Sequence, residues 1–216
     1  WTRTVAIDGT DSGGDRTTGT ETTSATIRLT MTKRPGAASF QLEDNGSSYS
    51  GSFTTNTQRT ELDSGGGASC VVTHNANGNG AGKMPKRPTS TSAPALFANI
   101  VPARSAVGSG TKAIILTPIL RYSGEDTITY VGQGISPCSN GQDVDPIDGT
   151  LNPGGDARQV CYPAGTSKAI ATPTANDVVG AWNQRKKAFV FDCTRTYSDG
   201  AGATVTVKVS GALKPA

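Results

Sequence analysis

The chain has 216 residues, of which 34% are hydrophobic and 17% are charged, and its formal net charge is +3. So small a charge argues against a nucleic-acid partner, which needs clustered Lys and Arg, and the sequence has no apolar run of about 18 residues that predicts membrane insertion. Its 27 glycines, 12 prolines and many Thr and Ser residues are typical of short β-strands joined by frequent turns.

The elements expected along the chain are almost all strands. Residues 1–8, 24–32 and 203–211 alternate apolar and polar side chains, and this period of two predicts strands with one buried face. The first of these segments places Val5 and Ile7 on its apolar face. Further strands are predicted at 38–42, 68–73, 95–101, 112–122, 126–132, 158–162 and 187–193, separated by turns rich in Gly, Asn and Asp.

Four other segments are assigned to different structures. The glycine-containing segments 75–82 (NANGNGAG) and 123–126 (SGED) are predicted as turns. Residues 174–189 form the one segment with helical character, in which Asn176 or Asp177 would cap the helix. Residues 85–94 are rich in Pro, Ser and Thr and are predicted as an extended connector at a candidate internal boundary.

The segment GTDSGGD at 9–15 resembles the motif that carries the nucleophile of trypsin-like serine proteases, which would assign that role to Ser12. In that family the histidine precedes the serine, whereas His74, the single histidine of this chain, follows it. The chain repeats Asp-Ser-Gly-Gly at 63–66. Because Asp, Ser and Gly are turn-forming residues, we interpret both copies as turns and His74 as an exposed loop residue.

A second short motif, QRTEL at 58–62, resembles a strand motif of jelly-roll polysaccharide lyases, in which Arg and Glu face the sugar. The Gln/His and Tyr/Lys motifs that accompany it in those enzymes are not found in this sequence. Arg59 and Glu61 are therefore predicted to form a same-face pair on a strand.

The cysteines predict an oxidising compartment. Four cysteines with no CxxC spacing, beside one histidine, argue against a structural zinc site and favour two disulfides. We expect Cys138 to pair with Cys161 and Cys70 to pair with Cys193. The alternative is four reduced and buried thiols.

The segment 140–156 is acidic. Asp143, Asp145 and Asp148 approximate the oxygen-rich spacing of a calcium loop, because Ca²⁺ prefers several carboxylate and carbonyl oxygens within one turn. The segment departs from the EF-hand pattern, since Ile147 takes the place of the third ligand. The alternative is an acidic surface loop held by the disulfide between Cys138 and its partner, and no other cofactor is expected.

These observations predict one all-β domain spanning residues 1–216, with a β-sandwich or jelly-roll-like fold, Gly/Thr-rich loops and two disulfides. Residues 1–22 are expected to form an extended N-terminal arm. The opening at Trp1 rather than Met fits a mature product whose leader has been removed.

The chain is expected not to be an enzyme but a structural subunit of an extracellular or cell-surface assembly, such as a pilus, fibre, sheath, surface layer or shell. Copies of the chain would polymerise when residues 1–8 enter the sheet of a neighbour, where Val5 and Ile7 fill a groove. Two alternatives stay open. One is a secreted carbohydrate-binding or adhesive module that binds surface glycans, and the other is a viral capsid or appendage protein. In the first, the aromatic platforms would be Trp1, Tyr49, Tyr122 and Tyr197.

Overall fold

The computed structural model describes residues 1–33, 39–42, 47–62, 68–84, 95–102, 112–132, 138–151, 178–198 and 202–214. Within these ranges every regular element is a strand, which confirms the all-β prediction. The strands are β1 (Thr2–Thr10), β2 (Arg16–Arg28), β3 (Met31–Lys33), β4 (Ser39–Leu42), β5 (Ser48–Leu62), β6 (Ala68–Lys83), β7 (Ala95–Pro102), β8 (Lys112–Gly132), β9 (Gly141–Leu151), β10 (Val178–Asn183), β11 (Ala188–Ser198) and β12 (Ala203–Leu213).

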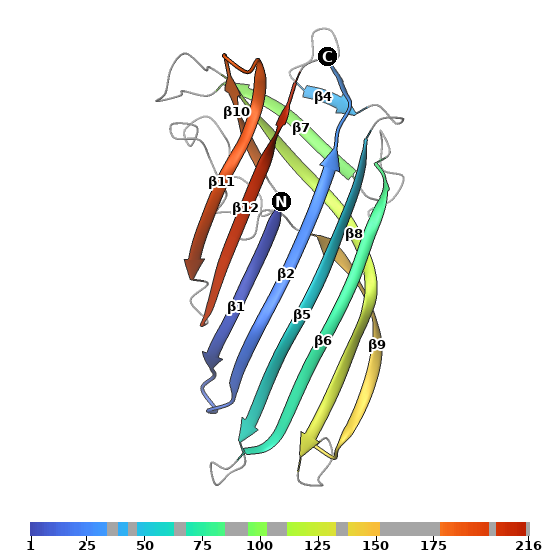
Figure 1. Cartoon of the computed structure of the whole chain (residues 1–216), viewed down its shortest axis with the longest axis vertical. Helices are drawn as coiled ribbons and strands as arrows, with labels where there is room; N and C mark the ends of the chain where they lie inside the picture. Colours follow the sequence, from blue (N-terminus) through green and yellow to red (C-terminus); the bar gives the residue numbers. More distant parts are fainter. Residues whose placement is uncertain are drawn as a thin grey trace.

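All of these strands belong to one curled antiparallel sheet, and the predicted β-sandwich or jelly-roll-like arrangement is not confirmed (Figure 1). The order along the sheet is β10-β11-β12-β1-β2-β5-β6-β8-β7-β4-β3, and β9 pairs with the outer edge of β8. β10 also pairs with β8, so the path returns on itself. The length of β8 makes this possible: residues 112–119 pair with β7, and residues 123–132 pair with β6.

The hydrophobic core lies where the sheet curls back on itself. The inward side chains of β1, β2, β11 and β12 pack there against the first half of β8 and against β10. Leu151, at the end of β9, is fully buried, and its Cδ1 lies close to the backbone of Gly51 on β5. Other core residues are Val5, Ala25, Tyr49, Leu116, Leu120, Val178, Phe189, Phe191, Val205, Val207 and Val209. The alternation predicted for 203–211 is confirmed, because Val205, Val207 and Val209 are buried.

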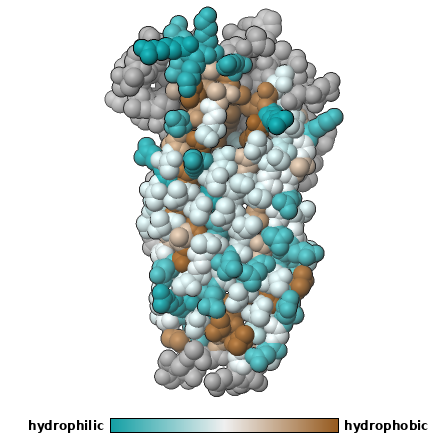
Figure 2. Space-filling model, in the orientation of Figure 1, coloured by the Kyte–Doolittle hydropathy of each residue, from teal (hydrophilic) through white to brown (hydrophobic). Residues whose placement is uncertain are grey.

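The opposite face of the sheet is built largely from Thr, Ser and Asn. One register row crosses six strands through Thr196, Thr206, Thr4, Thr22, Thr54 and Asn77. The side of the molecule in Figure 2 is accordingly mostly pale and teal, with few brown areas. Successive residues of a strand face opposite sides, so every second residue of these long strands lies on the outward face. The high threonine content of the chain reflects the size of that face.

Residues 1–22, expected as an extended arm, lie in the sheet as β1 and the first part of β2, with Val5 buried in the core of their own chain. The helix predicted at 174–189 is wrong over the residues described, because 178–183 form β10 and β11 begins at Ala188. Val178 and Val179 are β-branched and pack in the core, which favours the strand. The segments 63–66, 85–94 and 158–162 lie outside the described residues.

The turns predicted at 75–82 and 123–126 are also wrong, because both segments lie inside long strands, β6 and β8. Glycine occurs at alternate positions of β6, on the face that meets β8. A Cβ atom at Gly80 would collide with the carbonyl oxygen of Arg121, and one at Gly78 would lie 2.7 Å from the Tyr122 ring. These glycines therefore permit a close backbone approach within the sheet.

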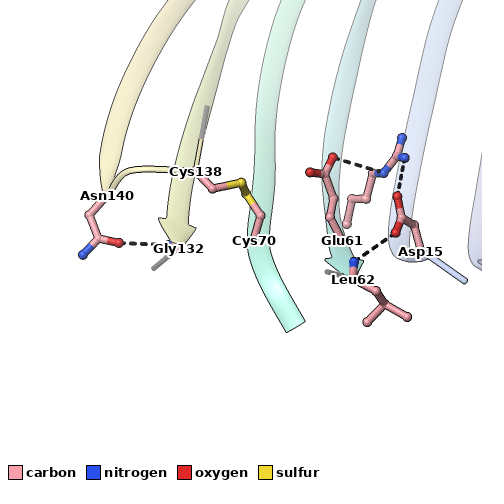
Figure 3. The surroundings of a disulfide bond; sticks show 8 residues. Asp15, Glu61, Leu62, Cys70, Gly132, Cys138 and Asn140 are labelled. Carbon is pink, nitrogen blue, oxygen red and sulfur yellow. Dashed lines mark hydrogen bonds and ion pairs between the residues drawn. A yellow bond between two sulfur atoms is a disulfide. The ribbon is translucent and has the colours of Figure 1, made fainter. Parts of the chain in front are cut away.

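One disulfide joins described residues, and it corrects the predicted pairing. Cys70 on β6 is bonded to Cys138, which precedes β9, so the predicted pairs Cys70 with Cys193 and Cys138 with Cys161 are wrong (Figure 3). Cys193 lies on β11, which is separated from β6 by β10 and β8 on the shorter way around the sheet, too far for a disulfide that needs Cα atoms within about 7 Å. Cys193 carries no free thiol, and Cys161 lies outside the described residues.

Candidate strand-binding groove

β1 is shorter than the two strands that flank it. Its ladders begin where Thr2 pairs with Ser24 on β2 and with Lys208 on β12. Beyond these pairs β2 continues to Arg28 and β12 continues to Leu213, and over this stretch their described partners are β5 and β11 alone. In Figure 1 the N-terminus lies where the space between β12 and β2 begins. Among the described residues no strand lies between β2 and β12 beyond Trp1, and we call this part of the sheet, in line with β1, the strand-binding groove.

The two walls of the strand-binding groove are strand edges. Trp1 and Ala25 exchange both of their backbone hydrogen bonds, at 2.7 and 2.9 Å. Because backbone groups alternate in direction along an antiparallel strand, Ile27 directs its N–H and C=O toward the groove. By the same alternation Ser210 and Ala212 direct theirs toward it from β12. The walls thus present donors and acceptors that match an extended backbone.

The floor of the strand-binding groove is apolar. It holds a pocket of about 110 Å³, lined among others by Trp1, Ile27, Leu29, Val178, Phe191 and Leu213. Gly211 contributes to the space, because no heavy atom lies within 4 Å of the position that a Cβ atom would take there. Figure 2 shows brown surface in the upper part of the molecule, and also near its lower end. An apolar floor between two polar backbone edges is the arrangement that binds an added β-strand.

The predicted calcium ligands do not lie in a loop. Asp143, Asp145 and Asp148 are on β9, where the first two share one face and Asp148 lies on the other, so the structure does not bring the three carboxylates together. Within the described residues one group of three potential ligands does lie together, namely Glu61, Cys70 and Cys138. Its two sulfur atoms are already joined in the disulfide.

β9 is instead a protected edge strand. Among the described strands it pairs only with β8, on one side. Three aspartates and Pro146 interrupt its sequence, and the aspartates are exposed. Charges and proline on an edge strand oppose pairing with another chain. The strand-binding groove carries no proline or aspartate on its two edges, where Ile27, Ser210 and Ala212 are uncharged and Arg28 is the charged residue of this stretch of β2.

Ser12 lies in the turn between β1 and β2, as predicted. The Asp11 carboxylate accepts hydrogen bonds from the backbone N–H groups of Gly13 at 2.8 Å and Asp15 at 3.1 Å. Gly14 has a φ of 92°, which glycine adopts without strain. The turn is therefore stabilised by its own side chains.

The prediction that His74 lies in a loop is wrong, because it lies inside β6, where Nδ1 is 2.9 Å from Oδ2 of Asp126 on β8. Through Thr57 and Gly19 its register row reaches Ile7, so His74 is three strands from β1. The structure joins His74 to a carboxylate and places Ser12 elsewhere. Sequence reasoning missed Asp126, because the pairing depends on the register of β6 with β8.

Arg59 and Glu61 form the predicted same-face pair, with 3.5 Å between Arg59 Nε and a Glu61 carboxylate oxygen. Arg59 also contacts Asp15, with 2.7 Å between Nη2 and Oδ2, and the N–H of Leu62 donates to the other Asp15 oxygen (Figure 3). The hydrogen bonds from Arg59 and Leu62 lower the pKa of Asp15. This cluster fastens the turn between β1 and β2 to the end of β5.

Replacing Arg59 with glutamine is expected to raise the pKa of Asp15 toward its ordinary value. Because the folded-state pKa is lowered, the ionised Asp15 stabilises the fold above the unfolded-state pKa, and this contribution disappears as the pH falls through the lowered value. Carboxyl NMR titration measures the change. Arg16→Gln is the matched control, since Arg16 pairs with Asp8. An Asp15 pKa that is unchanged in Arg59→Gln would contradict this assignment.

The four aromatic residues considered as a glycan platform are not exposed together. Tyr49 is buried, and its hydroxyl donates to the carbonyl oxygen of Arg121 at 3.1 Å. The Tyr122 ring stacks on Phe53 with 5.0 Å between centroids, and burial raises its pKa, with a smaller contribution from the charge of Asp148. Trp1 and Tyr197 pack against the core.

Comparisons of the chain with protein-family models, with curated proteins and with solved structures found no match. The described residues contain no helix that is long and apolar enough to cross a membrane.

Proposed function

We propose that the chain is a non-enzymatic structural subunit of an extracellular or cell-surface assembly, in which copies are joined when a neighbouring chain places an extended segment in the strand-binding groove. The observation that carries this proposal is that, within the part of the chain that the structure describes, the edges of β2 and β12 beyond Trp1 face each other with no strand between them and an apolar pocket beneath them. Each aliphatic side chain that becomes buried in such a pocket contributes about 1.5–3 kcal/mol.

Filling the strand-binding groove costs less free energy than the donation of β1 from one chain to another. β1 pairs with β2 along its whole length and with β12 over residues 2–7, and Val5 is 5% exposed. Donation of β1 would break both ladders and expose Val5 and Ile7. An added strand beside Trp1 breaks no pair between the described strands and covers Ile27 and Leu213, so strand addition at the groove is the favoured route.

Two further features support the extracellular setting. The disulfide between Cys70 and Cys138 is of the kind that persists in oxidising compartments. The acidic β9 edge opposes unspecific pairing along that strand. An assembly built through one defined strand position has one defined geometry between neighbours.

The test compares two adjacent residues on opposite faces of β2. Ile27→Glu places a charge over the apolar floor and is expected to reduce the assembled fraction at least about tenfold, because burying an unpaired charge is costly. Thr26→Glu lies on the outward face and is expected to assemble as the unaltered chain does. Sedimentation velocity at rising concentration, with electron microscopy of the assembled material, measures both.

A second pair of variants, on the other wall of the strand-binding groove, distinguishes a loss of assembly from a loss of folding. Leu213→Glu and its neighbour Ala212→Glu repeat the comparison on β12, and circular dichroism and thermal unfolding check that each variant folds. If the unaltered chain stays monomeric at all concentrations, or if folded Ile27→Glu assembles as well as Thr26→Glu, the proposal is overturned.

A further inference from the structure

We infer that Asn140 is a site of spontaneous covalent modification, at which the side-chain amide is converted to a carboxylate. The backbone nitrogen of Gly141 attacks the side-chain amide carbon of Asn140, and water then opens the product to aspartate or isoaspartate. Three Asn-Gly pairs lie within the described residues, and they have the same local chemistry but different surroundings. These surroundings single out the pair at Asn140.

An Asn-Gly pair reacts without an enzyme, and water is the only reactant that it consumes. The glycine N–H loses its proton to hydroxide, and the nitrogen forms a bond to the side-chain carbon of the asparagine. The amide NH₂ group takes up a proton and leaves as ammonia, so a five-membered succinimide remains. Water adds to either carbonyl of this ring and breaks the bond from that carbonyl to nitrogen. Glycine favours ring closure because no side chain crowds the nitrogen and its backbone rotates freely.

Two of the three pairs lie inside β6, where the sheet opposes ring closure. Asn77 and Asn79 each have a register partner on both neighbouring strands, β5 and β8. An extended backbone holds the side-chain carbon away from the next nitrogen, so the ring closes only after β6 has rotated out of the sheet. Gly78 and Gly80 are packed closely against β8, which leaves little room for that rotation.

Asn140 lies in a bend outside the regular part of the sheet. It is exposed and directly precedes β9. Gly141 is the first residue of β9, and its described partner is Tyr130 on β8. The end of a strand opens at little cost in free energy. The space around Gly141 is open, because the nearest heavy atom to a Cβ atom built there is the carbonyl oxygen of Ser139, at 3.8 Å.

The side chain of Asn140 is held in a way that favours the reaction. Its Oδ1 accepts a hydrogen bond of 3.0 Å from the backbone N–H of Gly132 (Figure 3). Negative charge develops on this oxygen when the nitrogen attacks, and a donor already in place stabilises that charge, as the donors of an oxyanion hole do. The same hydrogen bond restricts the side chain, so less conformational entropy is lost when the ring closes.

The modification changes the start of an edge strand. It adds one negative charge to a chain with a formal net charge of +3, close in sequence to Asp143 and Asp145 on β9. The isoaspartate product also adds one carbon atom to the main chain between Cys138 and the first pair of β9. Because charge on an edge strand opposes pairing with another chain, the modified β9 is expected to be protected more strongly.

The experiment follows the three sites in the full chain with its disulfides intact. The protein is incubated at mildly alkaline pH, once folded and once unfolded in urea, and tandem mass spectrometry of its peptides measures the conversion at each asparagine. In urea the three rates are expected to lie within about threefold of one another. In the folded chain Asn140 is expected to react at least about tenfold faster than Asn77 and Asn79, because reaction inside β6 requires a costly local opening. Its rate is expected to be no lower than in urea.

Gly141→Ala tests the role of the attacking nitrogen. The added methyl group hinders ring closure and fits the open space, so the variant is expected to fold and to react at Asn140 at least about tenfold more slowly. Gly82→Ala is the matched control, because a Cβ atom there makes an ordinary contact, and it is expected to leave the rate within about twofold.

The expected products at Asn140 are isoaspartate and aspartate together, since only opening of the ring produces isoaspartate. Equal rates at Asn140 and Asn77 in the folded chain would overturn the inference. So would slower reaction of Asn140 in the folded chain than in urea, or an unchanged rate in folded Gly141→Ala.

Discussion

Replacing Gly80 with alanine is expected to lower the free energy of unfolding by at least about 3 kcal/mol, the upper part of the range for an overpacked interior. The new Cβ atom would collide with the carbonyl oxygen of Arg121, and its next nearest neighbours are also backbone atoms. A backbone atom has no rotamer into which it can move. Relief requires β6 and β8 to separate, which breaks the ladder at the point where β8 turns toward β7.

Gly82→Ala is the matched control, on the same strand and the same face. The nearest atom to a Cβ at Gly82 is Cε1 of Tyr49, at 3.5 Å, which is an ordinary contact. Since alanine restricts the unfolded chain more than glycine does, Gly82→Ala is expected to leave stability within about 1 kcal/mol. Urea unfolding of both variants measures the difference. Equal stabilities would show that β8 does not approach β6 as closely as described.

The same glycines show why part of the fold escapes prediction from sequence. NANGNGAG has the composition of a turn, and the local rule that Gly and Asn mark turns assigns it wrongly. Its glycines are required by a strand more than 40 residues away, whose backbone they allow to approach. The segment 203–211 is predicted correctly, because its alternation reflects a local property, one buried face.

The strand-binding groove and the disulfide cannot be predicted from local sequence, because both depend on how strands distant in the sequence pair. Nothing in the residues of β1 indicates that its neighbours extend beyond Trp1, because this follows only from how β2 and β12 pair with it. Val5 and Ile7 were rightly placed on an apolar face, and both pack in their own chain. The pairing of Cys70 likewise depends on β6 lying beside β8, and cysteine spacing cannot reveal it.

The β9 edge and the strand-binding groove differ in how they would meet another chain, and this difference connects the fold to the proposed role. Chains that expose strand edges risk unspecific aggregation, and β9 carries the charges and the proline that oppose it. The strand-binding groove has an apolar floor, and its walls carry Ile27, Ser210 and Ala212 in place of the aspartates and proline of β9. In the proposed assembly, this contrast favours pairing with another chain at the groove over pairing at β9.

Removing the disulfide with Cys70→Ala and Cys138→Ala together is expected to lower the free energy of unfolding by about 4 kcal/mol. The bond closes a loop with a sequence separation of 68, and the loss of chain entropy in the unfolded state predicts this magnitude. Alanine suits both sites, because Cys70 is 1% exposed and a hydroxyl there would be buried without a defined partner. Urea unfolding without reductant measures the effect and leaves Cys193 unaltered.

The disulfide lies far from the strand-binding groove, so its removal is expected to change the stability of the fold without changing the groove. In Figure 1 β6 begins at the lower end of the sheet, whereas the strand-binding groove opens above the N-terminus, toward the other end. The double alanine variant is therefore expected to assemble as the unaltered chain does, measured by sedimentation velocity at temperatures where it is folded. A loss of assembly in a variant that is still folded would show that the two ends of the sheet are coupled, and the groove would then not be preformed by β2 and β12 alone.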